Sequence, residues 1–203
     1  YIRISVIFWL SLLYISFFSF NKTNSFQDAL IFIRFLFIPI LCYYIFFKKR
    51  KIFKQTLLFV TVLVIFVCID SFYQFLNYTP ENGFGEDLLG FKSNWYGRLT
   101  GPFGDELIPG SYISKFGLLG FAFLISIKRF ENKIIFHSIY LSSILFISFV
   151  SGERMAFATF GLGLVFLFIF LNGFRKSIFL SIIIGIFLIF ITTYLHPSYN
   201  DFK

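Results

Sequence analysis

The chain has 203 residues, of which 58% are hydrophobic, 24% aromatic and only 14% charged. Soluble domains carry about 25% charged residues and have no room for this much apolar side chain, so the composition excludes an ordinary soluble domain and indicates lipid as the solvent. The formal net charge of +8 is typical of basic cytoplasmic loops in a membrane protein, and we therefore expect no nucleic-acid partner.

The apolar runs predict an all-α fold, a polytopic bundle of transmembrane helices. Crossing the hydrocarbon core takes about 20 apolar residues. About seven runs approach this length and are expected as spans: 4–20, 30–47, 55–77, 110–127, 134–150, 155–171 and 178–195. We expect them to form a single transmembrane domain over residues 1–203. The first residue is Tyr1 and not Met, which favours a fragment of a longer protein. The alternative is a cleaved signal peptide, although the first apolar run is long enough to span.

Basic residues collect on one side of these expected spans. That side also holds the N-terminus and receives Arg3, Lys48, Lys49, Arg50, Lys51, Lys54, Lys128, Arg129, Lys133, Arg175 and Lys176. Because basic loops stay in the cytoplasm, we expect the N-terminus inside and residues 21–29, 78–109 and 151–154 outside.

The connection at residues 78–109 is far longer than the usual 2–8 residues, roughly, between bundle helices. Connections of this length are either functional or disordered. Trp95, Tyr96 and Phe103 argue against disorder, because disordered segments are poor in aromatic residues. We therefore expect an ordered, functional loop.

Two arginines, Arg98 and Arg154, stand out on the outer side, where most charges are acidic. The planar guanidinium group matches phosphate oxygens, so a pair of them at one membrane face can hold a lipid-borne diphosphate. Gly101 lets backbone amides approach the same anion. Two alternatives remain open: Arg154 extends to the lipid headgroups, or Arg98 pairs with Asp105 and Arg154 with Glu153.

The third apolar run ends in a polar helix face. Asp70, Gln74 and Asn77 are spaced i, i+4 and i+7, and therefore share this face. An acidic residue within a membrane span indicates function, and Lys115 is the expected charge partner of Asp70. The alternative is that Asp70 forms a hydrogen bond with Ser71 or with a neighbouring helix.

The sequence has no nucleotide-binding loop, nucleophile elbow or metal-ligand cluster. Cys42 and Cys68 both fall within apolar runs and are expected to be inert. His137 and His196 have no partner at metal-ligand spacing. We therefore expect neither a metal nor another cofactor.

The order of these motifs resembles the O-antigen ligase and O-antigen polymerase superfamily of bacterial envelope glycan enzymes. The matching elements are Gln74, the segment R-x-x-G-x-F-G-D at 98–105, G-x-Y at 110–112 and the turn SGERMA at 151–156. The resemblance covers residues 70–170, approximately.

The resemblance implies a membrane glycosyltransferase of the O-antigen ligase type, in the bacterial inner membrane, with its active site facing the periplasm. It implies metal-independent transfer of a glycan from an undecaprenyl-diphosphate carrier to lipid A-core or another acceptor. The alternatives are a polymerase of polysaccharide repeat units and a non-enzymatic membrane transporter.

Essential arginines of the family carry over to Arg98 and Arg154 in this chain. The general base stays open among Asp70, Asp105 and Glu106. The family's large late loop, which supplies a further His or Arg, is expected to follow Lys203. As catalytic residues we expect Arg98, Arg154, Asp70 and Asp105, and as substrate-binding residues Gln74, Gly101, Lys115 and Glu106.

Overall fold

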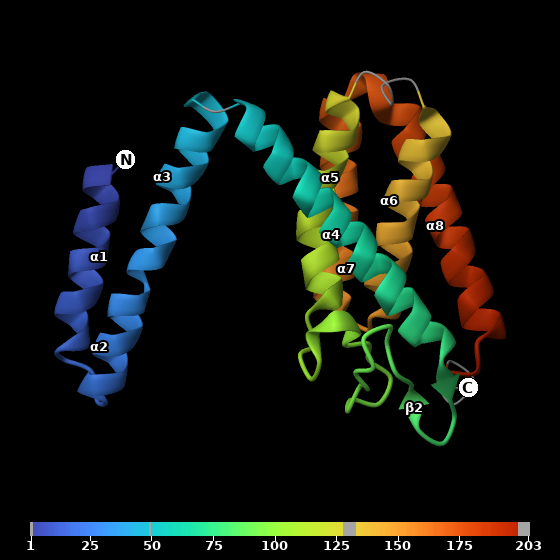
Figure 1. The fold of residues 1–203 in the computed structure, drawn as a ribbon, viewed down its shortest axis with the longest axis horizontal. Helices are drawn as coiled ribbons and strands as arrows, with labels where there is room; N and C mark the ends of the chain where they lie inside the picture. The colour runs from blue at the N-terminus through green and yellow to red at the C-terminus, as the bar shows by residue number, and fades with distance from the viewer. Residues whose placement is uncertain (1, 49, 128–132, 199–203) are drawn as a thin grey trace. The chain divides into compact units, whose positions relative to one another are not determined.

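The computed structural model describes residues 2–48, 50–127 and 133–198 (Figure 1). The chain divides into two compact units, Tyr1–Gln55 and Thr56–Lys203. Whether they act as the single domain expected over 1–203 stays a prediction. Three of the expected cytoplasmic basic residues lie outside the described residues: Lys49, Lys128 and Arg129.

The first unit is built from α1 (Ile2–Ser16), α2 (Lys22–Ile31) and α3 (Ile33–Lys48). The Trp9 indole nitrogen donates a hydrogen bond of 2.8 Å to the Ala29 carbonyl oxygen and so joins α1 to α2. The Asn21 side chain caps α2 by accepting a hydrogen bond from the Asn24 amide. Most of residues 21–29, expected as a loop, are therefore helical.

The second unit holds α4 (Arg50–Leu76) from Thr56 onward, and then α5 (Pro109–Ser126), α6 (Ile134–Val150), α7 (Arg154–Phe170) and α8 (Arg175–Leu195). Successive helices run in opposite directions (Figure 1). α6 contacts α5, α7 and α8, and the core between them contains fully buried side chains such as Phe121, Leu141, Ile144, Phe160 and Ile178.

One end of this bundle gathers the long loop, the ends of α4, α6 and α8, and the starts of α5 and α7 (Figure 1). We call it the loop end. The loop begins with a short hairpin of β1 (Tyr78–Thr79) and β2 (Gly83–Phe84), and contains the 3-10 helix η1 (Gly101–Phe103). A second 3-10 helix, η2 (Asn172–Phe174), precedes α8 at the opposite end.

Two helices in the described part of the chain are long and apolar enough to cross a membrane: Lys51–Leu76 and Asn172–Leu195. The expected bundle of seven spans is therefore wrong. α6 and α7 have 17 residues each, or about 25 Å at 1.5 Å per residue, against a hydrocarbon core of about 30 Å. α1 and α3 are shorter still, with 15 and 16 residues, and α5 opens with the polar stretch 110–115.

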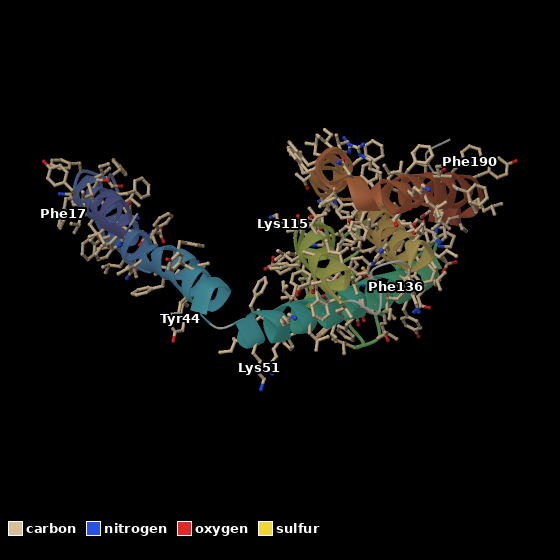
Figure 2. All side chains as sticks on the ribbon, turned by 90° about the horizontal axis from the view of Figure 1, so that it is seen from above. Phe17, Tyr44, Lys51, Lys115, Phe136 and Phe190 are labelled. Atoms are coloured by element: carbon tan, nitrogen blue, oxygen red, sulfur yellow. The ribbon has the colours of Figure 1, made fainter. Side chains whose placement is uncertain are left out.

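These two long helices differ from the core helices of soluble proteins, which are mostly buried. Only 22% and 17% of the most apolar 18-residue stretch of each helix is buried within the protein. Large apolar side chains are exposed both on these long helices and on others of the second unit, and Phe190 on α8 and Phe136 on α6 are examples (Figure 2). This apolar exterior suits a lipid environment.

Candidate functional site

Gln74 fastens the long loop to α4. Its side chain is fully buried. Its Oε1 accepts hydrogen bonds from the amides of Thr100 (3.0 Å) and Gly101 (2.9 Å). Its Nε2 donates to Thr100 Oγ1 (3.3 Å) and to the Gly85 carbonyl oxygen (3.4 Å). The loop thus uses both donors and both acceptor positions of this amide, and Gln74 positions the loop.

The rest of the polar face of α4 binds the same loop. Asp70 Oδ1 accepts a hydrogen bond of 3.0 Å from the Leu88 amide. Asn77 Nδ2 donates one of 3.0 Å to the Glu86 carbonyl oxygen. The expected ion pair of Asp70 with Lys115 does not form in the described structure, because Asp70 is buried and Lys115 is exposed.

The turn between α6 and α7 meets the loop from the other side. The Leu99 amide donates a hydrogen bond of 3.4 Å to the Ser151 carbonyl oxygen. Gly152 has φ +78°, and a Cβ at this position would lie 3.2 Å from both Arg98 Cγ and the Gly97 carbonyl oxygen. A glycine is therefore required here for both the backbone conformation and the close approach.

Glu153 caps the first turn of α5. Its Oε1 accepts a hydrogen bond of 2.8 Å from the Gly110 amide. Its Oε2 accepts hydrogen bonds from the amide (3.1 Å) and the hydroxyl group of Ser111. A carboxylate is favoured at this place by the unpaired amides and the dipole of the helix N-terminus. The charge of Glu153 is thus directed to α5 and not to Arg154.

Arg98 and Arg154 line one open cleft of about 1010 Å³ at the loop end. We call it the arginine cleft. Both side chains are exposed, and neither forms a salt bridge within the part of the chain that the structure describes. Asp105, the alternative partner of Arg98, accepts a hydrogen bond from Asn94 instead. The cleft therefore presents two guanidinium groups that form no salt bridge among the described residues, and Glu153, which also lines it, is bonded to α5.

The other expected site residues lie elsewhere. Asp70, Asp105, Glu106 and Lys115 do not line the arginine cleft. Gly101 is buried with φ +50°, and its amide is already bonded to Gln74. The structure thus brings the two expected arginines together, and does not bring the expected acidic residues to them.

One wall of the arginine cleft was not expected from the sequence. Ser198 lines the cleft, and its hydroxyl group lies 2.7 Å from His196 Nδ1. The His196 ring stacks on Phe75, with 4.0 Å between ring centroids. Burial lowers the pKa of His196, against the opposite effect of a hydrogen bond with the Phe75 backbone. The one sequence signal for this wall is that the chain becomes polar after the last apolar run, where His196 and Ser198 lie.

Within the described residues, no group of three or more His, Cys, Asp or Glu side chains gathers to hold a metal ion. Comparisons with protein-family models, curated proteins and solved structures find no match.

Proposed function

We propose that this protein is a membrane glycosyltransferase of the O-antigen ligase type. It transfers a glycan from an undecaprenyl-diphosphate carrier to lipid A-core or another acceptor, on the periplasmic side of the bacterial inner membrane. The observation that carries the proposal is the arginine cleft, which Arg98 and Arg154 line together from distant parts of the sequence, and where neither forms a salt bridge with a described residue.

The chemistry of the two side chains suits a diphosphate leaving group. A guanidinium group stays charged at all physiological pH values and donates two parallel hydrogen bonds to phosphate oxygens. Negative charge grows on the diphosphate as the bond to the sugar breaks, and donors fixed in advance stabilise that growth. Phe84, Phe149 and Phe157 in the cleft wall offer apolar contact to the first prenyl units of the carrier.

The basic residues of the two long helices support the proposal that the arginine cleft faces the periplasm. α4 carries Lys51 and Lys54 near its start, and α8 begins with Arg175 and Lys176. Both helices end at the loop end (Figure 1). Because basic flanks stay in the cytoplasm, the loop end with the arginine cleft faces outward.

Of the four residues expected to be catalytic, Arg98 and Arg154 line the arginine cleft, and Asp70 and Asp105 do not. Glu153 is the carboxylate in the cleft wall, and both its oxygens are bonded to α5. Asp70 and Asp105 lie outside the cleft, so their expected part as general base receives no support from the geometry.

The test is glycan transfer by the full-length protein in proteoliposomes, with protein amount measured in parallel. Loss of one preorganised electrostatic donor costs on the order of 10²–10³ in rate, and an ammonium group does not reproduce the guanidinium fork. We therefore expect Arg98→Lys and Arg154→Lys each to lower transfer by this factor. Arg175→Lys, at the opposite end of the bundle, is the control: its guanidinium group binds the Phe168 and Ile169 carbonyl oxygens, so the change should affect the protein amount at most and leave transfer per protein nearly unchanged. Near-normal transfer by both cleft variants would overturn the proposal.

A non-enzymatic protein that binds lipid diphosphates is the second candidate. It is favoured by one observation, that the cleft holds two arginines but no carboxylate free to act as a base. Binding of a prenyl diphosphate that depends on both arginines, without transfer to any acceptor, would support this second candidate.

A further inference from the structure

Three buried oxygen atoms under the loop have no hydrogen-bond partner within the described residues: Asp70 Oδ2, Asp87 Oδ2 and Ser71 Oγ. Asp70 and Ser71 are 0% exposed and Asp87 is 4% exposed. Buried polar atoms are rarely left without a partner, and neighbouring buried carboxylates need a compensating positive charge.

The three atoms belong to neighbouring residues. Asp70 Oδ1 accepts a hydrogen bond of 3.0 Å from the amide of Leu88, the residue that follows Asp87, so the two carboxylates are neighbours. A Cβ added to Gly101 would lie 2.8 Å from Ser71 Oγ and 3.5 Å from Asp70 Oδ2. The Gly101 backbone therefore lies close to these oxygens, and a side chain at this position would crowd them.

The other oxygens of both carboxylates are already bonded to the loop backbone. Asp70 Oδ1 accepts a hydrogen bond from the Leu88 amide at 3.0 Å. Asp87 Oδ1 accepts hydrogen bonds from the amides of Leu89 (2.9 Å) and Phe91 (2.6 Å). Each carboxylate is thus held in place by one oxygen, and its second oxygen is available to a ligand.

The Ser71 hydroxyl group provides a separate line of evidence, because its hydrogen bonding differs from that of other buried helical serines in this chain. Ser114, Ser148 and Ser181 each donate a hydrogen bond to the carbonyl oxygen three residues earlier, at 3.1, 2.9 and 2.7 Å. This local bond is the ordinary way to satisfy a helical hydroxyl group. The Ser71 hydroxyl has no such bond, and its oxygen and Asp70 Oδ2 both lie within 3.5 Å of where a Gly101 Cβ would be.

We propose that Asp70, Asp87 and Ser71 form a binding site for one divalent cation of the Ca²⁺ class. Ca²⁺ takes only oxygen ligands in flexible geometry, about six to eight of them, so that backbone carbonyl groups and water complete the set. Two carboxylates neutralise its charge. The cation joins α4 to the 78–109 loop, and the inference is independent of glycan transfer in the arginine cleft.

A proton shared between the two carboxyl groups is the competing occupant. It supplies one O–H bond between Asp70 and Asp87 but leaves Ser71 Oγ without a partner. A cation satisfies all three oxygens, and therefore explains more of the arrangement. No basic side chain takes this role in the described structure, since Lys115 is exposed and forms no salt bridge with Asp70.

The test is calorimetric titration of Ca²⁺ into the full chain, purified in detergent and freed of metal with a chelator at pH 7.5. We expect one Ca²⁺ per chain. Removing even an outer-shell partner weakens a metal site about 10–100-fold, so Asp70→Asn and Asp87→Asn should weaken binding at least about tenfold. Asp105→Asn is the matched control, because it removes an exposed carboxylate of the same loop, and should bind as the unaltered protein does.

A second readout covers variants that fold poorly. Ca²⁺ should slow protease cleavage of the loop in the unaltered protein, and Ser71→Ala, the smallest change, should weaken this protection. No Ca²⁺ binding by the unaltered protein, with cleavage independent of Ca²⁺, would reject the site and favour the shared proton. Equal weakening by Asp105→Asn and Asp70→Asn would also reject it, since binding would then be general to surface acids.

Discussion

Gly101 carries two structural demands at a single residue. Its φ of +50° is costly for residues with a side chain, and a Cβ there would lie 2.8 Å from Ser71 Oγ. We expect Gly101→Ala to cost about 1–2 kcal/mol of unfolding free energy for the backbone and about 1–3 kcal/mol for crowding. Chemical unfolding of the purified protein in detergent measures this loss.

Gly90→Ala is the matched control for crowding. Gly90 has φ +86° in the same loop, and no atom lies within 4 Å of an added Cβ. This variant should therefore show the backbone cost alone, about 1–2 kcal/mol. Equal destabilisation by the two alanines would show that Gly101 is not packed against Ser71.

His196 predicts a pH dependence of stability at the loop end. Its pKa is lowered in the folded protein from the ordinary 6.5, because burial disfavours the charged ring. A lowered folded-state pKa makes stability highest above pH 6.5, and stability is lost as pH falls and the unfolded chain binds a proton more readily. The melting temperature should therefore drop between about pH 7.5 and 5.5.

His196→Gln isolates this contribution, because every other titratable group remains in both proteins. The variant should show a smaller drop in melting temperature over the same pH range. An unchanged drop would mean that the charge state of His196 does not affect folding.

At the residue level, the spacing of polar residues predicted which of them share a helix face, whereas their chemistry did not predict what they bind. The i, i+4, i+7 spacing placed Asp70, Gln74 and Asn77 on one helix face, and each of them binds the 78–109 loop. Helical periodicity predicts a shared face, but not what covers it. A substrate was expected for Gln74, whereas the loop backbone occupies its amide. The convergence of Arg98 and Arg154 followed from the common side of the two loops.

At the level of elements, α5 depends on a cap from a distant part of the chain. The Glu153 carboxylate accepts hydrogen bonds from Gly110 and Ser111 in the first turn of α5. Loss of a helix cap costs about 0.5–2 kcal/mol, so Glu153→Ala should lower the unfolding free energy by that amount, and Glu153→Gln by less. Urea unfolding measures the loss, and Glu106→Ala, which removes an exposed acid of the 78–109 loop, is the control. Equal effects of the two alanines would contradict the cap.

The elements themselves were only partly predictable. The tight turn at 151–154 is confirmed, since α6 ends at Val150 and α7 begins at Arg154. The number of spans was wrong, because hydropathy reports apolar runs and does not report where a helix ends. The run at 4–20 stops as a helix at Ser16, and the run at 30–47 is divided at Phe32 between α2 and α3. Hydrogen bonds of caps and turns decide such ends, and they involve residues that hydropathy ignores.

At the scale of the whole molecule, α4 and α8 set the polarity of the bundle. Each has basic residues near its start and ends at the loop end, and the chain returns between them through α5, α6 and α7 (Figure 1). The arginine cleft, the Glu153 cap and the proposed cation site all lie at the loop end. The opposite end carries η2 and the basic start of α8. The polar chemistry of the second unit is thus concentrated at one end, as expected of a site that works at one membrane face.

The last prediction tests this polarity by cysteine labelling in intact cells. Cys42 and Cys68 are first replaced by serine, and single cysteines are then introduced as Lys92→Cys in the loop and Lys176→Cys at the start of α8. Both lysines are exposed, so that access depends on the side of the membrane and not on burial. If the basic helix start stays in the cytoplasm, an impermeant maleimide should label position 92 in intact cells and position 176 only after permeabilisation. The reverse pattern would place the arginine cleft in the cytoplasm and would contradict the proposed transfer on the periplasmic side. Equal labelling of both positions in intact cells would mean that the α8 start and the loop are not separated by a membrane at all.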